Sequence, residues 1–152
     1  FQLRKQYLPF PKFYLQFDLD EKLQNCSSLK STISQIKNVP AGESIGYNRS
    51  YYTDKASRIA IIAIGYADGL NRALSNKKGC VYIHGKKADI IGNICMDMSF
   101  IDLSNIDAVV GDKVEIFGAN NSIKEIAKSI NTIPYEILSS ISQRVVRIYE
   151  KE

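Results

Sequence analysis

The chain is poor in the residues that build metal centres and covalent frameworks. Its 152 residues include one histidine, His84, and three cysteines, Cys26, Cys80 and Cys95, none of them in a CxxC pair. One histidine cannot make a metal site, and three widely spaced cysteines suggest neither a disulfide framework nor a zinc site. We therefore expect no bound metal, and we expect reduced thiols in a cytoplasmic protein.

Long apolar runs and a strong excess of charge are also missing. The longest apolar run, residues 59–64, is strand-sized, whereas a membrane-spanning helix needs about 20 residues. The net charge of +4 is modest, and the basic residues are scattered among acidic ones, which argues against a nucleic-acid-binding protein. An apolar content of 45% instead fits one globular domain, with no membrane or nucleic-acid partner expected.

The hydrophobic pattern predicts short β-strands with little helix. A capped helix is expected from Ser122, with Glu125 completing a capping box, and a shorter helix near Pro134. The predicted fold is mainly β, a closed or partly open barrel or a sandwich, with one or two small helices. The expected strands cover residues 29–36, 58–64, 80–84, 88–92, 98–103, 113–117 and 144–149, with a hairpin turn at 85–87.

The first residues differ from the rest. Residues 1–24 mix prolines with aromatics and have no clean period, so we expect an extended lead-in or linker there. A β-domain would then occupy residues 25–152.

Two tyrosines follow glycines. Tyr47 stands in Gly-Tyr-Asn-Arg-Ser-Tyr, residues 46–51, and Tyr66 in Gly-Tyr-Ala-Asp-Gly, residues 65–69. Taken alone, Tyr47 would be a half-buried strand tyrosine, and Asp68 would bond its own backbone in a strand-to-loop turn. The functional alternative places a phenol near a cation and displays Tyr66 at a strand end, where ligand contacts gather.

Two further segments carry possible chemistry. Met96, within Cys-Met-Asp at 95–97, would ordinarily be core packing, and Cys95 lacks a neighbouring base that could make it a nucleophile. Tyr135 follows Pro134 at the expected helix start, where backbone amides favour an anion. The alternative is that Tyr135 and Glu136 only cap and pack the helix.

In this order and spacing, the four segments, with the closing Arg-Val-Val-Arg at 144–147, resemble the C-terminal domain of alanine racemase. The resemblance covers about residues 29–149. It implies a homodimer in which an N-terminal (β/α)8 barrel carries pyridoxal phosphate on a lysine, and the β-domain covers the partner's barrel mouth. The implied reaction interconverts L- and D-alanine for peptidoglycan. No lysine of the chain matches the cofactor lysine's motif, so the chain alone is expected to be inactive.

The resemblance also implies roles for individual residues. Tyr47 would act as acid and base on one face of the substrate, opposite the barrel lysine. The Met96 backbone amide would contact the substrate carboxylate, and Tyr66 would narrow the entry to a methyl-sized side chain. Tyr135 would hydrogen-bond the cofactor phosphate. The access corridor would be lined or supported by Arg72, Asp68 and Ile133.

One departure from the family pattern concerns Asn93. Many members have an arginine at this position, two residues before the cysteine, so the corridor here should be less cationic. Asn93 and the Ser-Gln-Arg ending at 142–144 resemble the corresponding residues of racemases that are fused behind a cell-wall peptide ligase.

Other functions stay open from the sequence. The chain could be a docking or dimerisation module without chemistry, or part of a racemase acting on serine or another small amino acid. A small nucleic-acid-binding barrel would require exposed aromatics beside a basic stripe.

Overall fold

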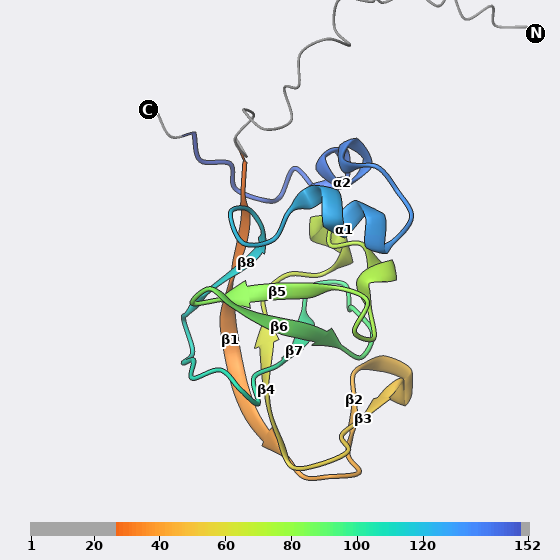
Figure 1. Ribbon diagram of the computed structural model, residues 1–152, viewed down its shortest axis with the longest axis vertical. Coiled ribbons are helices and arrows are strands. Elements are labelled where there is room, and N and C mark those ends of the chain that lie inside the picture. Colours follow the sequence, from red (N-terminus) through yellow and green to blue (C-terminus); the bar gives the residue numbers. More distant parts are fainter. Residues whose placement is uncertain (1–26, 150–152) are drawn as a thin grey trace, which may run out of the picture.

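Six antiparallel strands close into a barrel in the computed structural model, which describes residues 27–149 (Figure 1). Their order around the barrel is β1-β4-β7-β6-β5-β8, and a separate two-stranded sheet pairs β2 with β3. The predicted mainly-β fold is therefore confirmed, in its closed form. The predicted lead-in, residues 1–24, lies outside the described residues. The strands are β1 Leu29–Val39, β2 Ser44–Ile45, β3 Tyr51–Tyr52, β4 Ser57–Ile62, β5 Cys80–Ile83, β6 Lys86–Ile91, β7 Ser99–Asp102 and β8 Lys113–Phe117.

The long strand β1 closes the barrel by pairing on both sides. Its first part runs antiparallel to β8, with Thr32 opposite Lys113, and its later part pairs with β4, with Val39 opposite Ser57. The register shifts once in each pairing, between Leu29 and Lys30 and between residues 33 and 35. Such irregularities bend a strand and increase its twist, which helps one strand reach both neighbours.

The barrel interior is filled by branched aliphatic side chains. Strand β7 alternates between buried and half-buried residues, the pattern of a strand with one face toward a core. Burying side chains of this kind is the main favourable contribution to folding. The largest fully buried ones include Ile33, Ile62, Ile83, Ile90, Ile101 and Val114.

Two short helices lie together at one end of the barrel, away from the β2–β3 hairpin (Figure 1). Helix α1, Ile123–Ser129, is capped by the Ser122 side chain, which accepts a hydrogen bond from the Lys124 amide. Helix α2, Pro134–Ser140, has its proline in the first turn. Both predicted helix starts are confirmed, and the helices contribute Ile126, Ala127 and Ile137 to the core.

The predicted strand at 144–149 is wrong. These residues form a turn and an irregular segment, in which Val146, Ile148 and Tyr149 are more than four-fifths exposed. The physical reason is that each of the six barrel strands already pairs on both sides, so the closed barrel offers no free edge.

The hairpin turn between β5 and β6 lies earlier than predicted. Ile83 pairs with Lys86, so the turn consists of His84 and Gly85 rather than residues 85–87. Both turn residues have positive φ, 50° and 73°, as a two-residue hairpin turn matching the strand twist requires. Alternation alone did not reveal this, although histidine adopts positive φ more readily than most non-glycine residues.

Candidate active site

The turn that bears Tyr66 is in direct contact with the loop that bears Met96. The Tyr66 amide donates to the Cys95 carbonyl at 3.0 Å, and the Ala67 amide donates to the Met96 carbonyl at 3.0 Å. A Cβ atom on Gly65 would lie 2.3 Å from both carbonyl oxygens, so only glycine allows this approach. We call this contact the Gly65 junction. It places two of the expected substrate-binding residues side by side.

Asp68 organises the Tyr66 turn from within. One oxygen of its carboxylate accepts a hydrogen bond from the Gly65 amide at 2.8 Å, as expected for an acid that bonds its own backbone. The other oxygen accepts from Nε of Arg144 at 2.7 Å, and Nη2 of the same arginine donates to Asp97 at 2.6 Å. These hydrogen bonds, first to Asp68 and then to Asp97, raise the pKa of Arg144 above its ordinary value.

Sequence reasoning did not assign a function to Arg144. Its partners, Asp68 and Asp97, are 76 and 47 positions away along the chain. In the expected strand at 144–149, Arg144 would simply have been one of the residues that alternate between the two faces. Local spacing carries no signal for such a contact. Only the Arg-Val-Val-Arg ending drew attention to this residue.

Tyr47 is displayed on a 3-10 turn, Tyr47–Arg49, rather than on a strand. Gly46 precedes it with φ 75°, and Asn48 and Arg49 follow with φ 61° and 47°. These turned backbone conformations leave Tyr47 72% exposed, so its interpretation as a half-buried strand tyrosine is wrong. An exposed phenol is free to contact a ligand or a partner chain.

Two asparagines tie the Tyr47 turn to the rest of the site. Asn93 donates from its side chain to the Tyr47 carbonyl at 3.1 Å, and the side chain of Asn76 donates to Asn93 at 3.2 Å. The residue that departs from the family pattern thus supports the backbone of the tyrosine turn.

A pocket of about 410 Å³ lies between the Tyr47 turn and the Met96 loop. Met96 is 53% exposed, so the interpretation of Met96 as core packing is wrong. Cys95 is buried, and burial raises the pKa of its thiol, opposed by a backbone hydrogen bond of Tyr47 and the charge of Arg72. A thiol held protonated is a poor nucleophile, as expected. The pocket is lined by Gly46, Tyr47, Cys95, Met96, Asp97, Met98 and Phe100.

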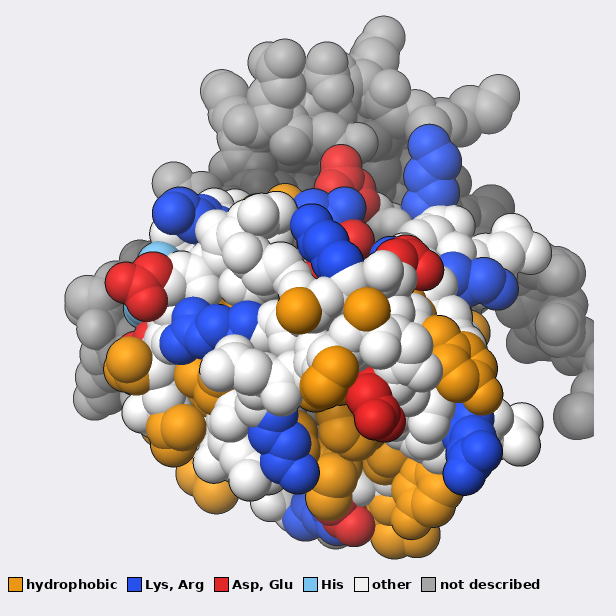
Figure 2. All heavy atoms as spheres, turned by 90° about the horizontal axis from the view of Figure 1, so that it is seen from below, with side chains coloured by type: hydrophobic (Ala, Val, Ile, Leu, Met, Phe, Trp, Pro, Cys, Tyr) orange, Lys and Arg blue, Asp and Glu red, His pale blue; other side chains and the backbone are white. Residues whose placement is uncertain are grey.

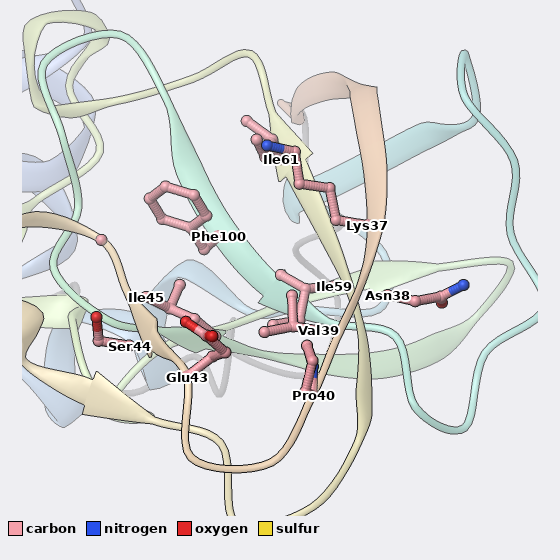
Figure 3. Close-up of a pocket in the computed structure, with 11 residues that line it drawn as sticks. Lys37, Asn38, Val39, Pro40, Glu43, Ser44, Ile45, Ile59, Ile61 and Phe100 are labelled. Carbon is pink, nitrogen blue, oxygen red and sulfur yellow. The ribbon is translucent and has the colours of Figure 1, made fainter.

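A second hollow of about 260 Å³ adjoins this pocket and shares Gly46 and Phe100 with it. Figure 3 shows the Phe100 ring on one side and Ile45, Ile59 and Val39 grouped on the other, with side chains from β1, β2, β4 and β7. Its charged groups are Lys37 and Glu43. The hollowed surface therefore continues from Tyr47 onto the outside of the barrel wall.

Tyr135 lies at the start of α2 and is 77% exposed, with Ile133 just before it at 59%. The other end of α2 packs on the Tyr66 turn: a Cβ atom on Gly69 would lie 2.6 Å from the Ser140 carbonyl oxygen. The Ser142 amide also donates to the Asp68 carbonyl at 3.1 Å. Tyr135 is thus connected to the Tyr66 turn through its helix.

Arg72 belongs to a neighbouring 3-10 turn, Arg72–Leu74. Its carbonyl accepts a hydrogen bond from the Ser75 hydroxyl, whose oxygen in turn accepts from the Ile94 amide at 3.0 Å. This connection holds the Arg72 turn against the strand end that leads into the Met96 loop.

Charge is mixed on the face that carries the β2–β3 hairpin. Figure 2 shows hydrophobic side chains gathered over part of this face, with lysine, arginine and acidic side chains spread among them. Within residues 27–149, no group of three or more His, Cys, Asp or Glu side chains is placed to hold a metal ion. In the same range, no helix has the length and apolar character of a membrane span.

A family model described as "Alanine racemase, C-terminal domain" matches residues 26–149. The chain belongs to the alanine racemase C-terminal domain family. Among relatives, it is 46% identical over 131 residues to an alanine racemase of Helicobacter pylori, covering 84% of this chain and 34% of that protein. It is 45% identical over 132 residues to alanine racemase 2 of Caldanaerobacter subterraneus, with the same shares covered.

Solved alanine racemase structures share the fold. The biosynthetic enzyme of Pseudomonas aeruginosa superposes with a TM-score of 0.82 at 36% identity, covering 86% of this chain and 37% of that one. The Bartonella henselae enzyme, crystallised with covalently bound pyridoxal phosphate, gives 0.78 at 40% identity, covering 81% and 34%. The chain therefore spans about a third of the length of the relatives that it matches.

Proposed function

We propose that this chain serves as the C-terminal domain of a pyridoxal-phosphate-dependent racemase that interconverts L- and D-alanine for peptidoglycan synthesis. The observation that carries the proposal is the shared surface of Tyr47, Met96 and Tyr66. The Gly65 junction joins the last two, and the pocket of about 410 Å³ joins the first two. An exposed phenol beside an exposed loop suits a half-site that a second protein surface completes.

Each residue of the half-site has a proposed part in the reaction. Tyr47 exchanges a proton with Cα from one face of the substrate, while a base on the other face comes from the barrel. Inversion requires two such groups on opposite faces. The Met96 amide binds the substrate carboxylate, and Tyr66 restricts the space beside it. Arg72, Asp68 and Ile133 line or support the approach.

The donor set fits a supporting part in holding pyridoxal phosphate. Tyr135 presents an exposed phenol at the start of α2, suited to donate a hydrogen bond to a phosphate. When bound, the cofactor acts as an electron sink for the charge that develops at Cα. The lysine that carries it belongs to the barrel, as in the family pattern. This chain alone is therefore expected to be catalytically silent.

The proposed partners are the barrel of the same protein and the barrel of a second subunit. The shared surface of Tyr47, Met96 and Tyr66, which we call the Tyr47 surface, would cover the mouth of the second barrel, so that each homodimer contains two complete sites. The free thiols of Cys80 and Cys95 agree with the proposed cytoplasmic location.

The test is reconstitution. This chain replaces the matched segment of the Helicobacter pylori relative, or is expressed beside its own barrel; we call either product the assembled enzyme. Racemisation of L-alanine and D-alanine is followed by chiral chromatography, with serine as a competing substrate and the isolated chain as control. Turnover of alanine in both directions by the assembled enzyme supports the proposal.

Other outcomes point to other functions. Stable association with the barrel but no turnover of any amino acid would favour a docking module. Faster turnover of serine than of alanine would favour a racemase of different specificity, since one small group in a pocket discriminates by only about 1–3 kcal/mol.

A further inference from the structure

We propose that Arg144 is a positioning residue that sets the affinity of the site for the substrate carboxylate, by fixing the Met96 loop against the Tyr66 turn and neutralising Asp97. This inference rests on the proposed function, because it assumes that Met96 binds a carboxylate. It concerns a residue that itself contacts no reacting atom.

The guanidinium of Arg144 bridges two loops that carry proposed substrate contacts. Nε donates to Asp68 in the Tyr66 turn at 2.7 Å, and Nη2 donates to Asp97, next to Met96, at 2.6 Å. The bridge therefore parallels the Gly65 junction, where the same two segments meet through their backbones. The Gly65 junction joins the two loops by backbone hydrogen bonds, and Arg144 joins them by ion pairs.

The two halves of the bridge differ in their exposure to water. The Asp68 side chain is 15% exposed, whereas those of Asp97 and Arg144 are 57% and 47% exposed. Asp68 also accepts from the Gly65 amide and would keep that bond without Arg144. Asp97 has only the arginine as a recorded partner among the described residues, so its position and charge depend more on Arg144.

The charge of Asp97 matters because of its location. It is adjacent in sequence to Met96 and lines the same pocket as Tyr47. An unneutralised carboxylate there would repel the carboxylate of an incoming amino acid. Arg144 thus acts on affinity twice, by fixing the loop and by removing this repulsion.

An arginine is required for this geometry. Its planar fork presents Nε and Nη2 together to two acceptors, whereas a lysine ammonium is a single point charge on a flexible stem. The backbone before Arg144 is held independently, since the Ser142 amide donates to the Asp68 carbonyl at 3.1 Å. A change of the side chain should therefore leave the path of the segment in place.

The experiment compares Arg144→Ala, Asp97→Asn and the double variant in the assembled enzyme. We expect Arg144→Ala to raise KM for L- and D-alanine about tenfold with a smaller change in kcat, as for loss of a charge-assisted contact. Asp97→Asn should change KM about twofold or less. The double variant should recover part of the lost affinity, because the unpaired charge is gone while the loop is still not fixed by an arginine. Arg144→Lys should fall between the parent and Arg144→Ala.

Propionate supplies a readout separate from turnover. Its binding, measured by calorimetry, probes carboxylate affinity alone, and it should weaken in Arg144→Ala in parallel with KM. Arg147→Ala is the matched control: Arg147 is a nearby arginine whose guanidinium donates to the backbone carbonyls of Ile141, Ser142 and Val145. It should leave propionate affinity within about twofold.

Three results would overturn the inference while the proposed function stands. They are an unchanged KM in Arg144→Ala, no recovery in the double variant, or an equal loss of propionate affinity in Arg147→Ala. A parent enzyme that does not racemise alanine would instead reject the proposed function.

Discussion

The barrel wall and the Tyr47 surface are built on opposite principles. In the wall, paired strands bury aliphatic side chains such as Ile62, Ile83 and Ile101, each at most 1% exposed. On the Tyr47 surface, a 3-10 turn leaves Tyr47, and an irregular loop leaves Met96, more than half exposed. Stability is thus concentrated where no ligand can reach, and the proposed chemistry lies where little apolar area is buried. Substitutions in the wall should therefore change mainly the unfolding free energy, and substitutions on the Tyr47 surface mainly the activity.

The largest expected effect on activity comes from Tyr47→Phe. Removing the phenol oxygen from the assembled enzyme should lower kcat about 10²–10⁴-fold, the usual contribution of a general acid or base. Because kcat/KM in the two directions is tied by the equilibrium, it should fall equally for L- and D-alanine. Thermal unfolding should not change, because the side chain is 72% exposed.

Tyr52→Phe is the matched control for that experiment. Tyr52 is an exposed tyrosine on β3, five residues away, and it lies outside the lining of the Tyr47 pocket. Its loss should leave kcat within about twofold. Undiminished racemisation in both directions by Tyr47→Phe would refute the assigned role.

The opposite behaviour is expected from Ile101→Ala in the barrel wall. Ile101 is 0% exposed and pairs with Ala60 and Ile90 on its two sides. Truncation should cost about 2–5 kcal/mol of unfolding free energy, through lost burial and the remaining cavity. Chemical denaturation measures the loss, and kcat of the folded fraction should be nearly normal. A tenfold fall in kcat at full folding would mean that wall and surface are coupled.

The same division explains what the sequence could predict. Alternation in residues 113–117 and the apolar run before Gly65 predicted β8 and β4 closely, because burial on one or both faces leaves a local pattern. The predicted strand at 144–149 failed because pairing depends on whether an edge is free, which is a property of the whole barrel. Local pattern therefore describes the wall better than the surface.

The site was less accessible to local reasoning. Tyr47 and Met96 were each better explained as structural residues when taken singly, and only the order of four segments suggested otherwise. The exposure of Tyr47 follows from turned backbone at Asn48 and Arg49, for which the sequence gives little signal. The bridge from Arg144 joins positions far apart in sequence and could not be predicted at all.

At the Gly65 junction, one substitution should reduce both the stability of the domain and the substrate affinity of the assembled enzyme. In Gly65→Ala the added methyl would lie 2.3–2.4 Å from backbone atoms of Cys95 and Met96, which no rotamer change can relieve. We expect a loss of about 1–3 kcal/mol of stability and a raised KM, because the loops must separate. Urea unfolding and steady-state kinetics on one preparation measure both.

Gly85→Ala in the β5–β6 turn is the comparison for Gly65. Its φ of 73° strains a substituted residue, but nothing lies within 4 Å of the added methyl. It should lose about 1 kcal/mol of stability and leave KM unchanged. An equal change in KM for the two variants would show that general destabilisation, and not the junction, controls the site.

The smallest expected effect concerns alkaline pH and the thiol of Cys95. Burial raises the pKa of this thiol, so above about pH 9 the unfolded chain loses the proton before the folded one does. The unfolded state then binds fewer protons, and stability falls as pH rises toward the folded-state pKa. Cys95→Ala removes this contribution, so its unfolding free energy should decline less steeply between pH 8 and about pH 10.

Burial also raises the pKa of Cys80, which lies on β5 in the barrel wall. Adding Cys80→Ala to Cys95→Ala should therefore flatten the decline further. Equal slopes in all three proteins would show that neither thiol contributes to the alkaline loss.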